Sequence, residues 1–467
     1  MPSQLDWSAY ETSDPLAFGD PFGAPTPPSS PDSGFANALA TCHGKQACLR
    51  TDQEVMCPSF RLTGEARHSP FHRAQVLRKA LTADTGDGSA FDTETVRSAL
   101  ELCIGCKGCK RECPNGMDIA LAATEARARA HALTGKRALR ERLFTDLPQR
   151  APLLRRLRPI IRFIDRVPLL GPRVKSALGL SPHRRLPVPA RRSFHDLRRL
   201  TSYGSGDCGD VVLLADTFSN HFEPGIADAA LQLLTGLGYG VHLPRGALDE
   251  APLCCGRTWL SQGHVDEARR HAARLVDTLA PYVDAGMPIV GLEPSCLLML
   301  RDEYRALGLG GKVTGLAKAA KLFEEFMVEA AARAPDSLTL SPLPDRPVLF
   351  HGHCHQKAFG TTAAMGQLLE RIPGARVSQI RAGCCGMAGA FGYEKEHHEL
   401  SVRMAEETLL PAVRNAPPDA LIVANGTSCR QQILDGTGRR PLHLAQVLAM
   451  QFLPSGQVPE AETQPAT

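Results

Sequence analysis

Short β-branched runs alternate with amphipathic stretches from about residue 208 onward. The runs DVVLLAD, YGVHLP and MPIVGLEP predict strands over 210–216, 239–244 and 287–294, and PVLFHGHC, ARVSQI and ALIVANG predict strands over 347–354, 375–380 and 420–426. Between them apolar residues recur at helical spacing, as from Val265 to Ala285. Strands that alternate with helices favour parallel sheets in layered α/β units.

The same landmarks occur twice in this region. Cys254, Cys255 and Gly256 correspond to Cys384, Cys385 and Gly386, and each doublet is followed by a lone cysteine after a later strand. The spacing from doublet to lone cysteine is 41 residues in the first case, to Cys296, and 44 in the second, to Cys429. We infer an internal duplication, with a first repeat over 208–340 and a second repeat over 341–453.

The segments before and after the repeats have other patterns. Residues 1–36 are rich in Pro, Ser, Gly and Asp and predict a disordered leader, as does the tail 454–467. Residues 37–135 combine cysteine clusters with helical periodicity, and 136–207 form a basic, proline-punctuated helical connector. The predicted fold class is α+β multidomain, with a helical, cysteine-rich domain followed by two α/β repeats with mainly parallel sheets.

Positive charge is concentrated in the connector. Between Lys136 and Leu200 there are 18 Lys and Arg against four acidic residues, although the net charge of the 467-residue chain is only +4. Such a run is either a solvated helical face or a surface that docks on an acidic partner or on anionic lipid. Nucleic acid is not expected as a partner, because aromatics are not interleaved with the basic residues and no recognised binding motif is present.

The chain has 15 cysteines among 43% hydrophobic and 22% charged residues, a composition typical of a globular protein. We find neither a secretory signal nor an apolar run of about 18 residues, so we expect a cytoplasmic protein, with peripheral attachment to the cytoplasmic face of the inner membrane as an alternative. In a reducing compartment, many cysteines favour metal binding or redox chemistry over disulfides.

The strongest motif is CIGCKGCKRECP, which has the bacterial ferredoxin spacing C-x2-C-x2-C-x3-C-P. Cys103, Cys106 and Cys109 therefore predict three ligands of a 4Fe-4S cluster, while a zinc knot is the alternative. In two-cluster ferredoxins the fourth cysteine ligates the other cluster. By this rule Cys57, which precedes Pro58, completes the first set, and Cys113 belongs with Cys42 and Cys48.

The set of Cys42, Cys48 and Cys113 has only three cysteines, because Lys45 occupies the middle position of its motif. A three-iron cluster, a four-iron cluster with water or a protein ligand at one iron, and an eroded site are all compatible with this set. His43 is a candidate substitute ligand.

The two cysteine doublets are poor candidates for disulfides. Consecutive Cα atoms lie about 3.8 Å apart, whereas bridged cysteines prefer about 5.5–6 Å. Adjacent thiolates can instead reach two metals, and the following glycine allows a tight turn and a close backbone approach. We therefore predict a metal or redox site from Cys354, Cys384, Cys385 and Cys429, with buried structural thiols as the alternative. His351, His353 and His355 are expected to tune this site by hydrogen bonding.

These motifs, together with MCPSFRLTGEARHSPFHRAQVLR, GHCHQKA, GCCGMAGAFGYEKEHHE and NGTSCRQQI, resemble the iron–sulfur half of bacterial FAD-linked oxidases of the D-lactate and D-2-hydroxyglutarate dehydrogenase group. The chain is also similar, more distantly, to the iron–sulfur subunits of glycolate oxidase and anaerobic glycerol-3-phosphate dehydrogenase. The resemblance implies two cysteine-rich CCG domains like those of the heterodisulfide reductase B subunit, each with a lone cysteine, a doublet and a C-x2-C.

This chain departs from the complete CCG pattern. Gly426 stands where the second repeat would have the first cysteine of its C-x2-C, and Glu293 stands at that place in the first repeat. No cysteine lies near Thr217 and Phe218, where the lone one of the first repeat belongs. We expect a four-thiolate site in the second repeat, and a supporting or vestigial role for Cys254, Cys255 and Cys296.

The resemblance implies an electron-transfer subunit that works with a separate FAD-binding chain. That chain would oxidise a small 2-hydroxy acid, and the electrons would pass to quinone or another acceptor. The alternative function is a thiol-disulfide or heterodisulfide reductase that uses the CCG cysteines as its catalytic site. A zinc-stabilised interaction protein without redox function is the least compatible with the ferredoxin spacing.

Overall fold

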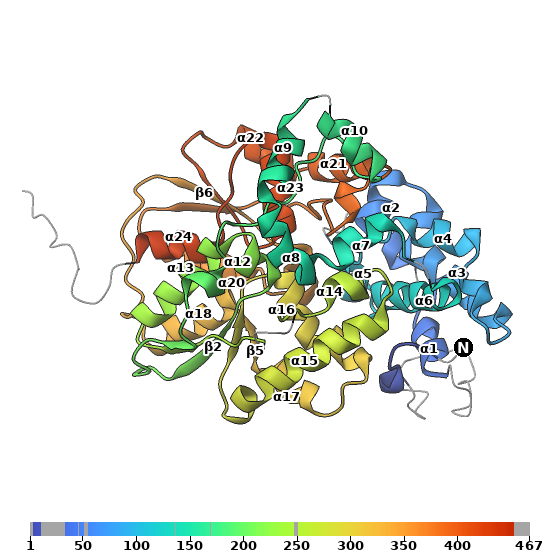
Figure 1. Cartoon of the computed structure of the whole chain (residues 1–467), viewed down its shortest axis with the longest axis horizontal. Coiled ribbons are helices and arrows are strands. Elements are labelled where there is room, and N and C mark those ends of the chain that lie inside the picture. The colour runs from blue at the N-terminus through green and yellow to red at the C-terminus, as the bar shows by residue number, and fades with distance from the viewer. Residues whose placement is uncertain are drawn as a thin grey trace, which may run out of the picture.

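The N-terminal part of the chain is helical. A computed structural model describes residues 3–10, 33–44, 46–50, 55–135, 137–168, 170–246 and 251–452. Its first helices are α1 (Ser33–Ala40), α2 (Pro58–Thr63), α3 (Pro70–Ala83), α4 (Glu94–Glu101), α5 (Gly108–Glu112) and α6 (Ile119–Thr134). They lie together on one side of the molecule (Figure 1). Ser69 and Asp118 accept backbone hydrogen bonds at the starts of α3 and α6, as N-cap residues do.

Residues 3–10 pack against these helices, so the disordered leader predicted over 1–36 is wrong for this stretch. Leu5 and Trp7 are buried, and both the backbone N–H of Leu5 and the indole N–H of Trp7 donate to the buried carboxylate of Glu125. The composition of residues 1–36 as a whole does not reveal the two apolar residues Leu5 and Trp7, because most of that segment is rich in Pro, Ser, Gly and Asp. Residues 11–32, and residues 454–467 of the predicted tail, lie outside the described part of the chain.

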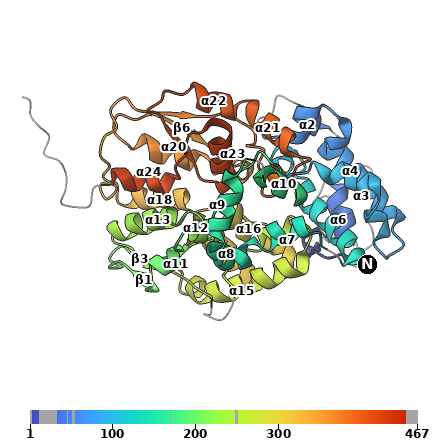
Figure 2. The ribbon, with the colours of Figure 1, turned by 45° about the horizontal axis from the view of Figure 1, so that its top comes forward.

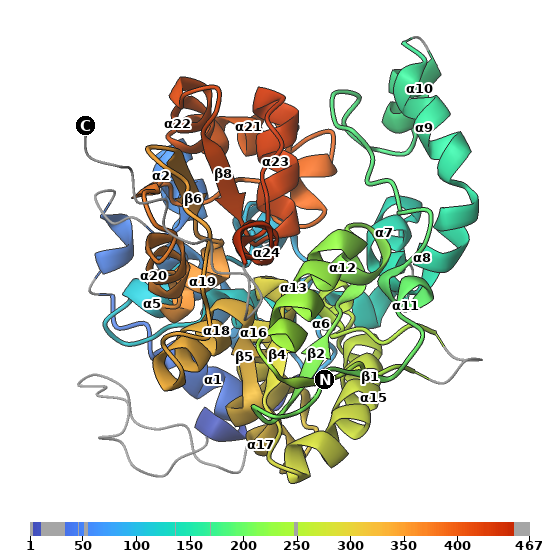
Figure 3. The same ribbon diagram turned by 90° about the vertical axis from the view of Figure 1, so that its left-hand side faces the viewer.

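The connector is helical, as predicted. It contains α7 (Leu139–Thr145), α8 (Leu147–Arg156), α9 (Arg158–Arg166), α10 (Leu170–Ala177) and α11 (Phe194–Leu197). Figure 3 shows α9 and α10 at the edge of the molecule, beside the second repeat. The loop after α10 attaches there through backbone hydrogen bonds from Ser181 to Tyr393 and from Lys395 to Gly179.

The sheet of the first repeat has five strands in the order β1-β3-β2-β4-β5, and its first strand, β1, lies before residue 208, in the range predicted for the connector. Its strands are β1 (Ser202–Tyr203), β2 (Asp210–Leu214), β3 (Gly240–His242), β4 (Ile289–Gly291) and β5 (Ala320–Leu322). All pairs are parallel except β1 with β3. Its helices are α12 (Thr217–His221), α13 (Pro224–Gly236), α14 (Arg257–Leu260), α15 (Val265–Asp284), α16 (Pro294–Arg301), α17 (Lys312–Ala319) and α18 (Phe323–Arg333).

The second repeat contains a parallel three-stranded sheet with the order β7-β6-β8. Its strands are β6 (Pro347–His351), β7 (Arg376–Gln379) and β8 (Leu421–Ala424). Its helices are α19 (Cys354–Phe359), α20 (Ala363–Glu370), α21 (His398–Glu406), α22 (Leu409–Asn415), α23 (Thr427–Thr437) and α24 (Leu444–Gln451). The order β7-β6-β8 corresponds to β3-β2-β4 of the first repeat, which supports the inferred duplication.

The predicted α+β fold class with mainly parallel sheets is confirmed. The two repeats share one apolar core, because Val290 and Phe326 of the first pack in the same cluster as Val348 and Leu448 of the second. The other face of the first sheet packs toward the N-terminal helices, in a cluster that joins Val212 to residues such as Leu77. Figure 2 shows the second repeat above the first, with the N-terminal helices at one end of both.

Besides β1, which was not predicted, two details of the repeats differ from the sequence prediction. β5 was not predicted, because it is three residues long with Lys321 at its centre. The stretch from 394 to 413 forms two helices, α21 and α22, instead of one; Pro411 has no N–H to donate to residue 407, which interrupts a continuous helix. Among the described residues, no helix is both long and apolar enough to cross a membrane.

Candidate functional site

Four cysteines converge around the loop that joins α4 to α5. Cys57 precedes α2, Cys103 and Cys106 lie between α4 and α5, and Cys109 lies in the first turn of α5. Burial raises the pKa of the Cys109 thiol, and the nearby thiols of Cys103 and Cys57 raise that pKa further. The thiols of Cys109 and Cys57 also act on Cys106, so the four thiols are neighbours, and four cysteine thiols are the donor set that a 4Fe-4S cubane requires.

The backbone around these thiols explains the small residues of the motif. A Cβ on Gly108 would stand 2.1 Å from the carbonyl oxygen of Val55, so only glycine lets the two segments meet. Gly105 has a φ of +64° and Lys107 a φ of +59°, a left-handed conformation that glycine adopts without strain. The turns at Gly105 and Lys107 curve the loop that carries Cys103, Cys106 and Cys109. A loop of this shape can surround a compact cluster.

Arg73 of α3 is a fully buried cation beside this group. Its Nη1 donates to the Sγ of Cys57 at 3.3 Å, its Nη2 to Ser59 at 3.1 Å and its Nε to the carbonyl of Ala99 at 2.8 Å. Burial lowers the pKa of Arg73, but the neighbouring Cys57 and Cys103 more than offset this, so the pKa is raised overall. A buried guanidinium placed in this way stabilises negative charge on the thiols. The sequence analysis did not predict this role of Arg73, although an arginine on the apolar face of a helix can indicate a buried functional cation.

A second group consists of Cys42, Cys48 and Cys113. Burial raises the pKa of Cys48 to about 11, and the nearby Cys42 and Cys113 contribute to the rise. Cys113 follows Cys109 by one turn, and its N–H donates to the Cys109 carbonyl at 3.0 Å, so the two groups are adjacent. Lys45 lies outside the described residues. This pairing of Cys113 with the upstream cysteines is the arrangement that the ferredoxin exchange rule predicts.

The four cysteines of the second repeat also lie together. Cys354 begins α19, the doublet follows β7, and Cys429 lies in the first turn of α23. A hydrogen bond with Cys384 and burial raise the pKa of Cys354, and Cys385 is hydrogen-bonded in turn to Cys429. All four sit beyond the carboxyl ends of parallel strands, where ligand sites of such sheets are found.

Glycine shapes both doublets in the same way. The N–H of Gly386 donates to the Sγ of Cys384 at 3.3 Å, and the N–H of Gly256 donates to the Sγ of Cys254 at the same distance. Their φ angles are +77° and +87°. A Cβ on Gly386 would stand 2.2 Å from the carbonyl oxygen of Ser401, and one on Gly256 would stand 2.8 Å from that of Ala268. The predicted tight turn and close approach are thus present in both repeats.

The first repeat has only three cysteines at the corresponding place. A hydrogen bond with Cys255 raises the pKa of Cys254, and Cys255 is also hydrogen-bonded to Cys296. Thr217, near which a fourth cysteine would belong, hydrogen-bonds to Cys254. Glu293 turns toward the second repeat, where its carboxylate accepts the backbone N–H of Thr427 at 2.8 Å.

The histidines of the segment HGHCHQK take three different positions. A ring nitrogen of His353 lies 3.9 Å from the Sγ of Cys354. His355 contacts the carbonyl of Gly105 at 3.0 Å and Arg257 at 3.1 Å through its Nε2. His351 is fully buried, and neither of its ring nitrogens has a hydrogen-bond partner among the described residues.

The cysteine group at Cys106 lies against the second-repeat group. Burial raises the pKa of Cys106 well above its ordinary value, and the thiols of Cys354 and Cys384 contribute to this rise. The contact between His355 and Gly105 joins the same two segments. Sequence reasoning could not predict this contact, because about 250 residues separate the segments and no local pattern reports it.

A cavity of about 1430 Å³ opens beside the cysteines. Its wall includes Cys103, Cys354 and all three cysteines of the first repeat, together with Arg257 and Arg430. Residues of the connector, such as Arg162 and Asp165, also line it. The cavity is therefore lined by both repeats and by the connector.

Residues 41–118 match the 4Fe-4S dicluster domain family, and residues 348–433 match the family described as cysteine-rich domain. The chain is 27% identical to the D-2-hydroxyglutarate dehydrogenase of Escherichia coli (strain K12) over 460 residues, which cover 87% of this chain and 43% of that protein. It is 26% identical to the probable glycolate oxidase iron–sulfur subunit of Bacillus subtilis (strain 168), covering 84% of this chain and 90% of that protein.

The C subunit of the anaerobic glycerol-3-phosphate dehydrogenase of Escherichia coli (strain K12) is 28% identical over 300 residues, which cover 63% of this chain and 70% of that protein. This chain spans less than half the length of the D-2-hydroxyglutarate dehydrogenases that it matches. The dicluster match supports iron–sulfur clusters as the cofactors. The chain therefore contains one segment that matches a 4Fe-4S dicluster domain and one that matches a cysteine-rich domain, and it is similar to the dehydrogenase and oxidase components just named.

Proposed function

We propose that this chain is the iron–sulfur electron-transfer component of an FAD-linked oxidoreductase that oxidises a small 2-hydroxy acid. The FAD would be held by a separate chain, and the electrons would leave to quinone or another acceptor. The observation that carries this proposal is the succession of three adjacent cysteine groups through the protein. They are linked at Cys109 and Cys113 and at Cys106 and Cys354.

The proposed ligands follow these groups. Cys57, Cys103, Cys106 and Cys109 would hold one 4Fe-4S cluster, and Cys42, Cys48 and Cys113 would hold a second cluster with three cysteine ligands. Cys354, Cys384, Cys385 and Cys429 would hold a further iron–sulfur cluster. Such clusters, when bound, supply one-electron transfer. We assign Cys254, Cys255 and Cys296 a supporting role, because Thr217 and Glu293 replace cysteines in that repeat.

The chain's own residues would favour this transfer in two ways. Arg73 stabilises negative charge at Cys57 through its 3.3 Å hydrogen bond. Lys107 is buried and pairs with Asp118 at 3.1 Å, with Glu303 at 3.3 Å and with Asp302. The ion pairs of Lys107 fix the ferredoxin-type loop against the first repeat, which keeps the cysteine groups at a constant separation.

We further propose that α8 and α9 rest on an anionic membrane surface. Leu153, Leu157, Ile160 and Phe163 are between 39% and 58% exposed on these helices. Arg156 is exposed alongside them, whereas Arg162 and Arg166 line the cavity. Apolar side chains flanked by arginine are typical of helices that lie in a membrane interface. A surface of this kind would bring the chain close to a quinone dissolved in the bilayer.

Vesicle sedimentation tests this surface. Vesicles that contain phosphatidylglycerol should carry the protein down, and neutral phosphatidylcholine vesicles should do so weakly. The variant Ile160→Ser with Phe163→Ser should lose most of this binding, whereas Leu133→Ser, at a separately exposed leucine of α6, should retain it. Equal sedimentation of both variants would contradict the proposal, and binding to the flavoprotein through the same face would assign the surface to the partner.

Electron transfer itself is tested with the anaerobically purified, cluster-loaded chain and a candidate flavoprotein. Addition of a 2-hydroxy acid to the mixture should bleach the visible absorption of the clusters, and neither protein alone should respond. Cys106→Ser should abolish or slow the bleaching at least roughly tenfold, since it removes a ligand from the central group. Cys208→Ser is the matched control, because Cys208 is exposed and outside all cysteine groups. Reduction of a disulfide by the chain alone would instead favour the heterodisulfide-type reductase.

A further inference from the structure

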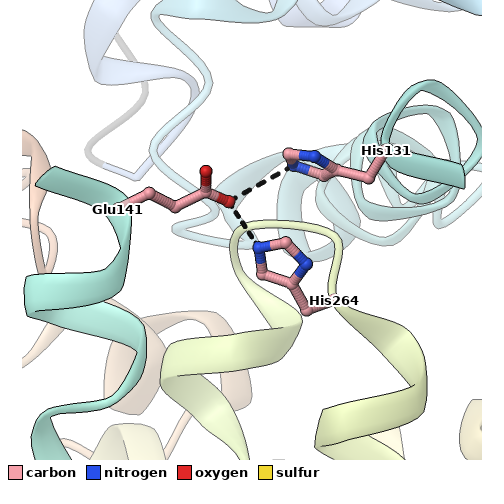
Figure 4. Close-up of side chains that lie close together, drawn as sticks. All are labelled: His131, Glu141 and His264. Carbon is pink, nitrogen blue, oxygen red and sulfur yellow. Dashed lines mark hydrogen bonds and ion pairs between the residues drawn. The ribbon is translucent and has the colours of Figure 1, made fainter. Parts of the chain in front are cut away.

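A cluster of metal-ligating side chains lies outside the cysteine groups. His131 near the end of α6, Glu141 of α7 and His264 in the turn between α14 and α15 point toward one another (Figure 4). One ligand atom from each lies within 4.8 Å of the others. We propose that these three residues bind a divalent metal ion of the Zn²⁺ type. Two imidazole nitrogens and one carboxylate oxygen are a donor set that zinc prefers, with a fourth position left for water.

One contact between the ligand atoms has the length expected around such an ion, and the other is a hydrogen bond that the ion would replace. The Nε2 of His131 lies 3.5 Å from the Oε1 of Glu141, and the Nε2 of His264 is hydrogen-bonded to the same oxygen. Zinc bonds of about 2.1 Å in a tetrahedron separate neighbouring ligands by about 3.4 Å. The two imidazole rings have their centroids 4.5 Å apart, so the two histidines lie side by side at the same carboxylate.

The surroundings of the cluster support binding. His131 makes a further hydrogen bond with the backbone of Gln262, the kind of contact that orients a ligating imidazole. His264 is buried, and the ring of Trp259 lies 6.0 Å from its ring, which limits access of water. The guanidinium of Arg127 lies nearby and donates hydrogen bonds to the carbonyl oxygens of Ser261, Leu100 and Cys103.

The position of the site suggests what the ion does. Its ligands come from the last helix of the ferredoxin-type part, from the connector and from the first repeat. One ion would therefore fasten three segments together, close to the loop whose Cys103 carbonyl accepts from Arg127. No local spacing marks this site in the sequence, because the ligands are at positions 131, 141 and 264.

The test uses the full-length, cluster-loaded chain, treated with a mild chelator and then titrated with Co²⁺ alone as the optical probe, with each spectrum recorded as the difference from the same protein without Co²⁺ so that the cluster absorption cancels. The proposal predicts about one tightly bound Co²⁺ per chain, with weak visible bands and no intense thiolate-to-cobalt charge transfer. Competition with Zn²⁺ should displace the Co²⁺. The readout is independent of electron transfer, so the proposal stands or fails separately from the proposed function.

The variants His131→Ala and Glu141→Gln should each weaken binding roughly tenfold or more, since each removes one of three ligands. Glu141→Gln keeps the size of the side chain and so guards against a folding defect. His242→Ala is the matched control, because His242 pairs with Asp210 away from the site. The proposal would be overturned if both variants bound Co²⁺ as tightly as the parent chain. It would also be overturned by a charge-transfer band of thiolate ligation or by the absence of Co²⁺ binding in the parent chain.

Discussion

His353 occupies the space that a side chain at position 426 would need. A Cβ built on Gly426 stands 2.4 Å from the Cδ2 of His353 and 3.3 Å from the Sγ of Cys429. Position 426 is where the CCG pattern would have another cysteine, so the imidazole takes the place of the missing thiol beside Cys354. The four cysteines of the second repeat therefore lie beside a histidine, whose ring fills the space of a side chain at position 426.

The contact between His353 and Gly426 gives a stability prediction. Gly426→Ala should lower the free energy of unfolding by about 1–3 kcal/mol, because the added methyl group overlaps the imidazole ring. Urea denaturation of the chain checks this value. Gly311→Ala is the control, since no atom lies within 4 Å of its Cβ position. If Gly426→Ala lowered the free energy of unfolding no more than the control does, the close packing of His353 against Gly426 would be contradicted.

A second variant tests the cause of that loss. In a double-mutant cycle, Gly426→Ala should cost much less in a His353→Ala background, because the overlapping ring has been removed. A coupling energy near zero would mean that the two residues do not compete for the same space.

Substitution at the doublet glycine should separate backbone strain from steric overlap. Gly386→Ala would introduce both effects, since φ is +77° at this residue and the added Cβ would stand 2.2 Å from the Ser401 carbonyl oxygen. Gly438→Ala would introduce only backbone strain, because φ is +72° at this residue and no atom lies within 4 Å of the added Cβ. We expect about 1 kcal/mol of destabilisation at Gly438 and several times more at Gly386, measured by chemical denaturation. Equal losses would argue against a tightly packed doublet.

Arg73 should tune the redox properties of the adjacent cluster. Arg73→Leu removes a buried positive charge and a hydrogen bond to Cys57, so the more negative, reduced form becomes less stable. The midpoint potential should therefore become more negative, as measured by an EPR-monitored redox titration. Arg97→Leu is the control, because that arginine is exposed and pairs with Asp92 at the surface. An unchanged potential in Arg73→Leu would exclude this role.

Glu324 should make stability depend on pH. Burial raises its pKa from 4.5 to about 7, although Gln356 and Asn425 donate hydrogen bonds to it. Because the folded chain binds this proton more tightly than the unfolded chain, its contribution is full below pH 4.5 and is lost as the pH rises toward 7. The loss is of the order of 3 kcal/mol.

The variant Glu324→Gln isolates this effect. It should flatten the fall in the free energy of unfolding between pH 4.5 and 7, as measured by urea denaturation across that range. Asp277→Asn, at an exposed carboxylate that pairs with Lys312 and does not act on Glu324, should leave the slope as it is. A slope that persists in Glu324→Gln would assign the pH dependence to other groups.

The sequence was sufficient for the features that rest on local patterns. Alternating runs predicted six strands that are present in slightly shorter form, and cysteine spacing grouped Cys103, Cys106 and Cys109. Contacts between distant segments were not predictable in this way. The proximity of Cys106 to Cys354, and the packing of Trp7 on Glu125, depend on how the domains assemble, which leaves no periodic signal in either segment.

The most direct test of the central claim is the iron and acid-labile sulfide content of the anaerobically purified chain, with EPR of the reduced protein. We expect a brown protein with at least roughly four iron and four sulfide per chain and a reduced 4Fe-4S signal. Cys106→Ser should lower the iron content, and Cys208→Ser should not. Protein that contains zinc in place of iron, or no metal at all, would contradict the assignment of iron–sulfur clusters to these cysteines.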